Sequence, residues 1–192
     1  MSIKNVSFIG LGVMGYPMAG HLQNNGYNVT VYNRTTAKAE KWVNEYKGNM
    51  ANTPGEASQS SEIVFMCVGR DEDIIEVMES ESGILSKVSE GTIIVDHTTA
   101  SAEIARNYYN KLKDKKFSFL DAPVSGGQAG AENGVLSIMI GGDEKDYNTV
   151  KPVLTSYGKA VELIGPSGSG QIAKMINQIC IAGLVQGLSE AM

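Results

Sequence analysis

The sequence predicts an α/β domain built on a doubly wound, mostly parallel sheet. Short, continuously apolar segments of strand length alternate with segments in which apolar residues recur at helical spacing. Strands that are apolar on both faces are typical of a parallel sheet that helices cover on each side. With 192 residues, the chain has room for one such domain and a short remainder.

The predicted elements alternate regularly from the N-terminus and less regularly after position 121. Apolar, β-branched or aromatic segments predict strands at 6–9, 27–32, 63–68, 92–95, 117–120, 135–140 and 160–164. Helical spacing predicts helices at 14–22, 38–46, 71–79, 100–112 and 143–157, and a last helix that follows the segment 165–170 and runs to the end of the chain. The last helical pattern stops without a Gly or Asn cap, so we expect that a C-terminal partner segment is missing.

Composition and charge exclude several classes of function. The chain has 16 Lys and Arg against 21 Asp and Glu, a net charge of −5, and no basic run, so we expect no nucleic-acid partner. The two cysteines, Cys67 and Cys180, form neither a disulfide framework nor a metal-ligand cluster, and no metal site is expected. The first residues lack the apolar core of a signal peptide, which favours a cytoplasmic location.

The most apolar stretch of the chain is 172–192. Polar residues, among them Lys174 and Asn177, interrupt it, so we expect no membrane span and instead a helix buried on several sides. Because such a helix gains from burial against another chain, we expect a homo-oligomer.

The segment 10–15 reads Gly-Leu-Gly-Val-Met-Gly between the first predicted strand and the first predicted helix. In this G-x-G-x-x-G motif, Gly10 permits a tight turn, Gly12 lets the backbone approach a pyrophosphate, and Gly15 lets the helix pack on the strand. The helix N-terminus adds free N–H groups and a partial positive charge. A plain glycine-rich turn is the alternative, which the strand-to-helix context disfavours. The candidate cofactor residues here are Gly10, Leu11, Gly12, Val13, Met14 and Gly15.

The end of the second predicted strand indicates which dinucleotide binds. A site for NAD(H) usually places Asp or Glu about 20 residues beyond the glycines, where it binds the ribose 2′-OH. Asn33, Arg34 and Thr35 occupy this position, and none is a carboxylate. Arg34 can pair with a 2′-phosphate, and the two neighbours can form hydrogen bonds with it. A solvated surface arginine is the alternative, but the position favours NADP(H) over NAD(H).

The segment 121–127, Asp-Ala-Pro-Val-Ser-Gly-Gly, follows the strand predicted at 117–120. Ser125 offers a hydroxyl, and Gly126 and Gly127 offer successive backbone N–H groups, an arrangement suited to a carboxylate. By itself the segment would pass for an ordinary loop.

A third candidate cluster lies on the last predicted helix. Lys174, Asn177 and Gln178 are spaced i, i+3 and i+4, so they project from one helix face among apolar neighbours. A lysine in apolar surroundings is rare unless it is paired or functional. The alternative is an exposed polar stripe on an amphipathic helix, which is common.

Three segments together resemble the signatures of the β-hydroxyacid dehydrogenase family: GLGVMGYPMAGHL at 10–22, DAPVSGG at 121–127 and GSGQIAKMINQ at 168–178. The family includes 3-hydroxyisobutyrate dehydrogenase, tartronate semialdehyde reductase and the glyoxylate and succinic semialdehyde reductases. Its members carry a Rossmann-type domain joined through a long helix to an all-helical C-terminal domain. The resemblance implies a dinucleotide-binding domain at 1–165, the first part of the interdomain helix at 166–192, and an absent C-terminal helical domain.

The resemblance also implies roles for individual residues. Lys174 would be the catalytic lysine, and Val68 and Thr99 would contact the cofactor. His97 lies near the chemistry but is not assigned as a base. The substrate carboxylate would be bound by Ser125, Gly126 and Gly127, with Asn177 and Gln178 completing the pocket.

The expected activity is an NADP-dependent oxidoreductase acting between NADPH and a small carboxylate-bearing semialdehyde or 2-keto acid, or the corresponding hydroxy acid. Lys174 would donate a proton to the developing alkoxide. Two alternatives stay open: a non-catalytic NADP(H)-binding module, and an imine reductase on the same scaffold. Lys174 argues against both, because a pure binding module needs no such lysine and an imine reductase uses a different proton donor.

Overall fold

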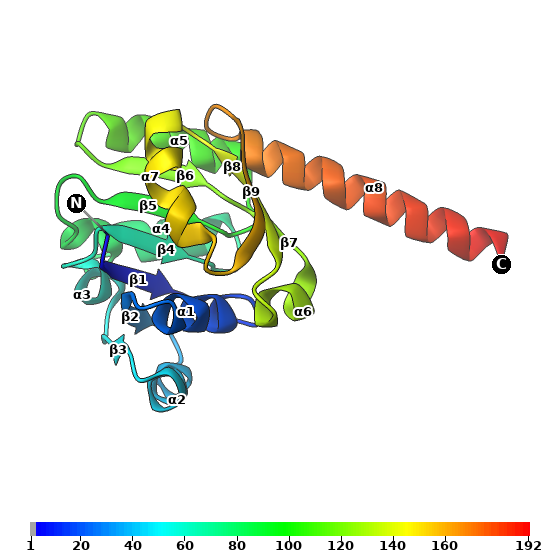
Figure 1. Ribbon diagram of the computed structural model, residues 1–192. Coiled ribbons are helices and arrows are strands. Elements are labelled where there is room, and N and C mark those ends of the chain that lie inside the picture. The colour runs from blue at the N-terminus through cyan, green and yellow to red at the C-terminus, as the bar shows by residue number, and fades with distance from the viewer. Residues whose placement is uncertain (1–2) are drawn as a thin grey trace.

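The computed structural model describes residues 3–192 as one nine-stranded sheet with helices on both faces (Figure 1). The strands lie in the order β3-β2-β1-β4-β5-β6-β8-β7, and β9 pairs with β8. The strands are β1 (Asn5–Ile9), β2 (Asn28–Tyr32), β3 (Asn49–Met50), β4 (Ile63–Met66), β5 (Ile93–Asp96), β6 (Ser118–Asp121), β7 (Val124–Ser125), β8 (Leu136–Gly141) and β9 (Gly158–Gly165). The predicted doubly wound α/β class is confirmed.

The helices connect these strands and pack against the sheet. They are α1 (Gly15–Asn24), α2 (Thr36–Tyr46), α3 (Pro54–Ser58), α4 (Asp71–Glu79), the 3-10 helix η1 (Ile84–Ser86), α5 (Ala102–Lys113), α6 (Gly127–Glu132), α7 (Glu144–Leu154) and α8 (Ser169–Ala191). Five short elements were not predicted from the sequence, because they carry neither a continuous apolar run of strand length nor enough residues for a helical repeat: β3, α3, η1, β7 and α6.

Six strands pair in parallel and set the position of the site. β1 lies between β2 and β4, and the parallel pairing continues through β5 to β6. The chain order therefore reverses at β1, where β2 lies on one side and β4 on the other. In open parallel sheets a ligand binds in the crevice beyond the carboxyl ends of the strands at such a reversal. Beyond β6, antiparallel pairing joins β8 to β6 and β7, while β8 and β9 are parallel.

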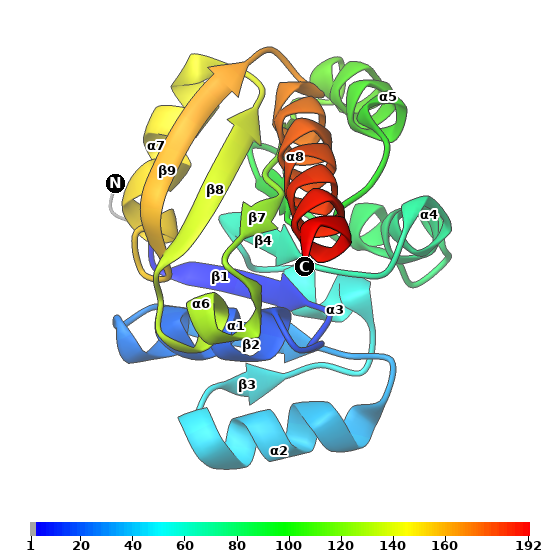
Figure 2. The same cartoon turned by 90° about the vertical axis from the view of Figure 1, so that its right-hand side faces the viewer.

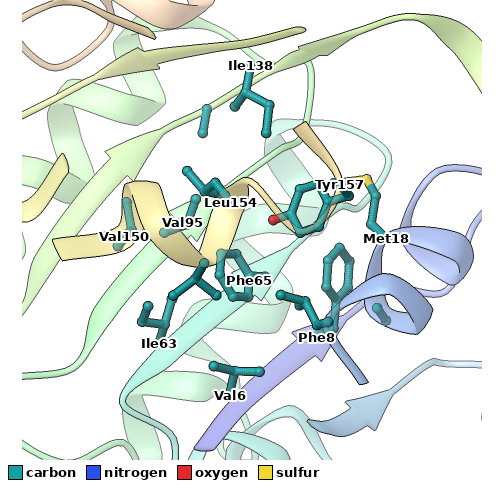
Figure 3. Close-up of a cluster of buried hydrophobic side chains, with 14 of the residues drawn as sticks. Val6, Phe8, Met18, Ile63, Phe65, Val95, Ile138, Val150, Leu154 and Tyr157 are labelled. Carbon is teal, nitrogen blue, oxygen red and sulfur yellow. The ribbon is translucent and has the colours of Figure 1, made fainter. Parts of the chain in front are cut away.

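The core consists of two apolar layers, one on each face of the sheet. Alternate residues of β4 divide between them: Ile63 and Phe65 face one layer, and Val64 and Met66 face the other. The first layer, shown in part in Figure 3, packs β-strand side chains against α1, α2 and α7. The second packs them against α3, α4 and α5. This division explains why β4 is apolar at every position.

Helix α8 differs from the sequence expectation. Its buried residues are Gly170, Gln171 and Lys174, and every residue from position 178 onward is exposed. The helix projects from the body of the domain, with the C-terminus at its far end (Figures 1 and 2). The expectation of a helix buried on several sides is therefore wrong for this chain, because only the first turns of α8 reach the sheet.

By length and composition alone, Ser169–Ala191 meets the criteria for a membrane-crossing helix, the one such helix among residues 3–192. The expectation that its polar residues exclude a membrane span stays a prediction, as does the expected homo-oligomer.

Candidate active site

The glycine loop between β1 and α1 lies at the carboxyl edge of the sheet. Gly10 has φ +95°, and a Cβ there would collide with the carbonyl oxygen of Cys67, the residue that directly follows β4. A Cβ on Gly15 would collide with the carbonyl oxygen of Gly10 and lie 2.9 Å from the Phe8 ring. A Cβ on Gly12 would meet no atom within 4 Å. Gly10 and Gly15 therefore close the turn, and Gly12 leaves the space in front of it open.

A cleft of about 430 Å³ opens in front of this loop. It brings together the loop, the end of β2, the end of β4 and one face of α4. The candidate cofactor residues that line it are Gly10, Gly12, Val13, Met14, Asn33, Arg34, Thr35 and Val68. Leu11 and Gly15 are buried beneath the loop, and Thr99 is exposed outside the lining.

Asn33 joins the two loops that border the cleft. Its Oδ1 accepts a hydrogen bond from the Leu11 amide at 2.9 Å, and its Nδ2 donates to the Thr35 carbonyl at 3.0 Å. From the sequence, Asn33 was expected to form a hydrogen bond with a 2′-phosphate, whereas both of its polar groups are bonded to backbone. Its contribution is to hold the glycine loop at a fixed distance from the end of β2.

The charges at the end of β2 are balanced. Arg34, whose side chain is 79% exposed, and Lys38 supply two cations to the cleft lining. Asp73 and Glu76 of α4 supply two carboxylates, 3.8 and 4.0 Å from the Arg34 guanidinium. The sequence did not predict these two partners of Arg34 or the second cation, Lys38. Lys38 could have been predicted, because it follows Arg34 by four residues in the first turn of α2. The two acids could not, because they come from a helix about 40 residues further along the chain.

The second cluster assembles where α8 crosses the loop after β6. Asn177 Nδ2 lies 3.3 Å from Ser125 Oγ, and this hydrogen bond joins two segments that are 52 residues apart in the chain. Gly126 and Gly127 are exposed beside Ser125, with φ of +138° and +62°. The structure therefore brings the two sequence motifs into contact.

Lys174 lies on the same helix, one turn before Asn177. Its side chain is largely buried, with 9% of the residue exposed, and it forms no ion pair within residues 3–192. Burial lowers the pKa of the Lys174 ammonium because desolvation disfavours its charged form. Gln178, expected on the same face, is instead exposed to solvent. Gln178 lies only about 40° around the helix from Lys174, so it shares that face, but it stands beyond the turns of α8 that reach the sheet, and its part in the pocket stays a prediction.

Two buried side chains that sequence reasoning missed fix the start of α8. Asp121, at the end of β6, accepts hydrogen bonds from the amides of Gly168 at 2.7 Å and Gln171 at 3.0 Å, so it caps the helix. Gln171 is 1% exposed; its Nε2 donates to the Thr98 carbonyl at 2.7 Å, and its Oε1 accepts from the Ala100 amide at 3.1 Å. A polar residue three positions before Lys174 was the available signal for Gln171.

His97 is part of a buried structural network. Its Nδ1 lies 2.6 Å from the Ala122 carbonyl oxygen and its Nε2 lies 2.8 Å from the Tyr157 hydroxyl. Because a carbonyl can only accept, Nδ1 carries the proton and Nε2 accepts from Tyr157. Burial lowers the pKa of His97 to about 4, so the ring is neutral near pH 7. A neutral ring with both nitrogens engaged agrees with leaving His97 without a role as base.

Asp96 is a buried acid beneath the same edge. The pKa of Asp96 is raised to about 7, chiefly by burial; hydrogen bonds from Thr98 oppose the rise, and the charges of Asp121 and Asp71 add to it. Asp96 and Asp121 are direct partners in the register of β5 and β6. Asp96 Oδ1 accepts from the Thr98 amide at 2.9 Å, which shapes the turn that leads to Thr99.

Comparisons with known proteins agree with this arrangement. The family model described as the NAD binding domain of 6-phosphogluconate dehydrogenase matches residues 5–165. An uncharacterized oxidoreductase of Shewanella frigidimarina is 57% identical over 190 residues, which are 99% of this chain and 65% of that protein. A probable mitochondrial 3-hydroxyisobutyrate dehydrogenase-like protein of Arabidopsis thaliana is 42% identical over 192 residues, 100% of this chain and 57% of that protein.

A solved structure, that of Mycobacterium tuberculosis 3-hydroxyisobutyrate dehydrogenase, superposes with a TM-score of 0.92 at 28% identity and covers 100% of this chain and 64% of that one. The chain thus spans less than two thirds of the length of these relatives. The match to the family model, together with these relatives, shows that the chain belongs to the β-hydroxyacid dehydrogenase family, whose nucleotide-binding part is that of 6-phosphogluconate dehydrogenase.

Proposed function

We propose that the protein is an NADP(H)-dependent oxidoreductase that interconverts a small carboxylate-bearing semialdehyde or 2-keto acid with its hydroxy acid. The observation that carries this proposal is the burial of Lys174, which forms no ion pair within residues 3–192 and lies one turn before Asn177, the residue that contacts Ser125. An unpaired buried lysine costs stability and is retained where its proton is used. The named activity of the A. thaliana relative and the presence of L-serine, a small hydroxy acid, with the M. tuberculosis enzyme support the same substrate class.

The cleft supports a dinucleotide as the cofactor. The open space in front of Gly12 admits a pyrophosphate, which a Cβ at that position would obstruct. Arg34 and Lys38 favour a 2′-phosphate at the far end of the cleft, and Val68 lines the end that leads toward Thr98. A bound nicotinamide supplies the hydride that passes to or from the substrate carbon.

The side chains at the start of α8 perform the proton transfer and the orientation. The Lys174 ammonium donates a proton to the alkoxide oxygen during reduction, and the neutral amine accepts the hydroxyl proton during oxidation. A pKa lowered by burial brings both forms closer to neutral pH. The Ser125 hydroxyl, the Asn177 amide and the N–H groups of the following glycines bind the substrate carboxylate, which holds the reacting carbon in place.

The test measures NADPH oxidation by the protein as isolated from its source and by the 192-residue chain, with NADH as the comparison. The substrates are glyoxylate, succinic semialdehyde, tartronate semialdehyde and methylmalonate semialdehyde. We expect turnover with one or more of these acids and a preference for NADPH. Lys174→Ala should lower turnover by about 100-fold or more while NADPH still binds. Lys159→Ala, at an exposed position on β9, is the matched control. Normal turnover in Lys174→Ala would contradict the assignment.

Substrate binding is tested separately from the proton transfer. Ser125→Ala should mainly raise KM for the acid, because the hydroxyl binds the carboxylate in ground and transition states alike. Unchanged kinetics would argue against that role. NADPH binding without turnover of any acid by the native protein would favour a binding module, and turnover of a cyclic imine alone would favour an imine reductase.

A further inference from the structure

The acidic face of α4 borders the cleft where the adenosine end of a dinucleotide would bind. Asp73, Glu76 and Val77 line the cleft, whereas Ile74 and Met78 of the same helix are buried in the core. The buried pair fixes the rotation of α4, since residues spaced by four lie on one face. The two carboxylates are therefore directed at the cleft by packing and not by a flexible loop.

These carboxylates face the positive charge of Arg34. The distances from the Arg34 guanidinium are 3.8 Å to Asp73 and 4.0 Å to Glu76, close enough for an ion pair and too long for a hydrogen bond. The N–H groups of Arg34 consequently stay available to a phosphate. With Lys38, the rim of the cleft holds two positive and two negative side chains and has no net charge.

We propose that Asp73 and Glu76 determine cofactor specificity by opposing the 2′-phosphate that Arg34 attracts. This inference rests on the proposed dinucleotide function. A phosphate monoester carries between one and two negative charges near pH 7, and like charges within a Debye length of about 8 Å repel one another appreciably. A cofactor with a free 2′-OH lacks this charge, so the carboxylates penalise NADP(H) and not NAD(H). The preference for NADPH is then smaller than Arg34 and Lys38 alone would give.

The experiment is titration of this chain with NADPH and with NADH, followed by nicotinamide fluorescence, at low and high salt. The variants are Asp73→Asn, Glu76→Gln and the double variant. Glu72→Gln is the matched control, because Glu72 lies on the same helix, pairs with Arg70 at 3.1 Å and is absent from the cleft lining. Far-ultraviolet circular dichroism checks that each variant folds.

Each neutralised carboxylate should lower the Kd for NADPH by about twofold to fivefold, the range for exposed charge pairs, and change the Kd for NADH by less than about twofold. The gain should shrink as salt rises, and the control should show none. Two results would overturn this inference alone, provided that the wild-type chain binds NADPH. One is an equal fall in the Kd for NADPH and for NADH in the variants; the other is an unchanged Kd for NADPH in the variants at low salt. Failure of the wild-type chain to bind either cofactor would overturn the proposed function together with it.

Discussion

Replacing Gln171 by methionine tests the buried contact between α8 and the loop after β5. Methionine has nearly the same size and shape but cannot form the hydrogen bonds to the Thr98 carbonyl and the Ala100 amide. Both bonds lie in or near the core, since Gln171 and Thr98 are each 1% exposed. The substitution therefore removes two hydrogen bonds and leaves a buried carbonyl without a partner.

The magnitude follows from the burial of each partner. A lost hydrogen bond costs about 1 kcal/mol, and a buried group left unpaired costs about 1–3 kcal/mol. The Thr98 carbonyl falls in the second class, whereas the half-buried Ala100 amide is within reach of water and falls in the first. We expect the free energy of unfolding to fall by about 2–4 kcal/mol in Gln171→Met.

Urea unfolding measures this loss. The chain has a single tryptophan, Trp42, which is fully buried and so reports unfolding by fluorescence, and circular dichroism provides a second probe. Gln178→Met, at an exposed position on the same helix, is the control and should change stability by less than about 0.5 kcal/mol. Equal stability of the two variants would refute the reasoning that the Gln171 bonds hold α8 to the domain.

Three further predictions concern the glycine loop and the buried titratable groups. Gly15→Ala should lower the free energy of unfolding in urea by about 1–3 kcal/mol, because its Cβ meets backbone and the Phe8 ring. Gly12→Ala should leave stability unchanged and weaken NADPH binding in a fluorescence titration. The reverse pattern would contradict the roles of the two glycines. Lowering the pH from 6.5 to 4 should reduce the free energy of unfolding of the wild type by about 3 kcal/mol relative to His97→Asn. The reason is that the imidazole takes up a proton in the unfolded chain but not in the folded one, where its pKa is lowered to about 4. Parallel curves of stability against pH for the two proteins would refute this prediction. For Asp96 the dependence of stability on pH has the opposite sign, because its folded pKa of about 7 exceeds the unfolded value of 3.8. Raising the pH from 4 to 8 should therefore reduce the free energy of unfolding of the wild type by up to about 4 kcal/mol relative to Asp96→Asn. An equal difference in stability between the two proteins at both pH values would contradict the burial of this acid.

Local patterns were sufficient for the fold and for the two motifs that form the site. The alternation of apolar strands with helical segments is a property of neighbouring residues, and it predicted the parallel sheet. The loop at 10–15 was readable because its three glycines follow a fixed spacing between a strand and a helix, although the Cys67 carbonyl that crowds Gly10 belongs to a remote segment. The spacing of Lys174 and Asn177 placed both on one helix face, and the structure brings that face to Ser125. Spacing alone did not show that Gln178, on the same face, lies where α8 has already left the sheet and is exposed.

The tertiary structure decided which charges and hydrogen bonds meet at the site. Asp73 and Glu76 reach Arg34 only because the order of strands places α4 beside the end of β2. Asn33 accepts a hydrogen bond from the Leu11 amide, and His97 is held neutral between Ala122 and Tyr157, contacts that cross 22 to 60 residues of chain. The sequence by itself determined the longer strands and helices, the nucleotide-binding loop and the identity of the candidate lysine, because each depends on short-range geometry. Electrostatic balance, tautomers and burial depend on distances between segments remote in the chain, and folding sets those distances.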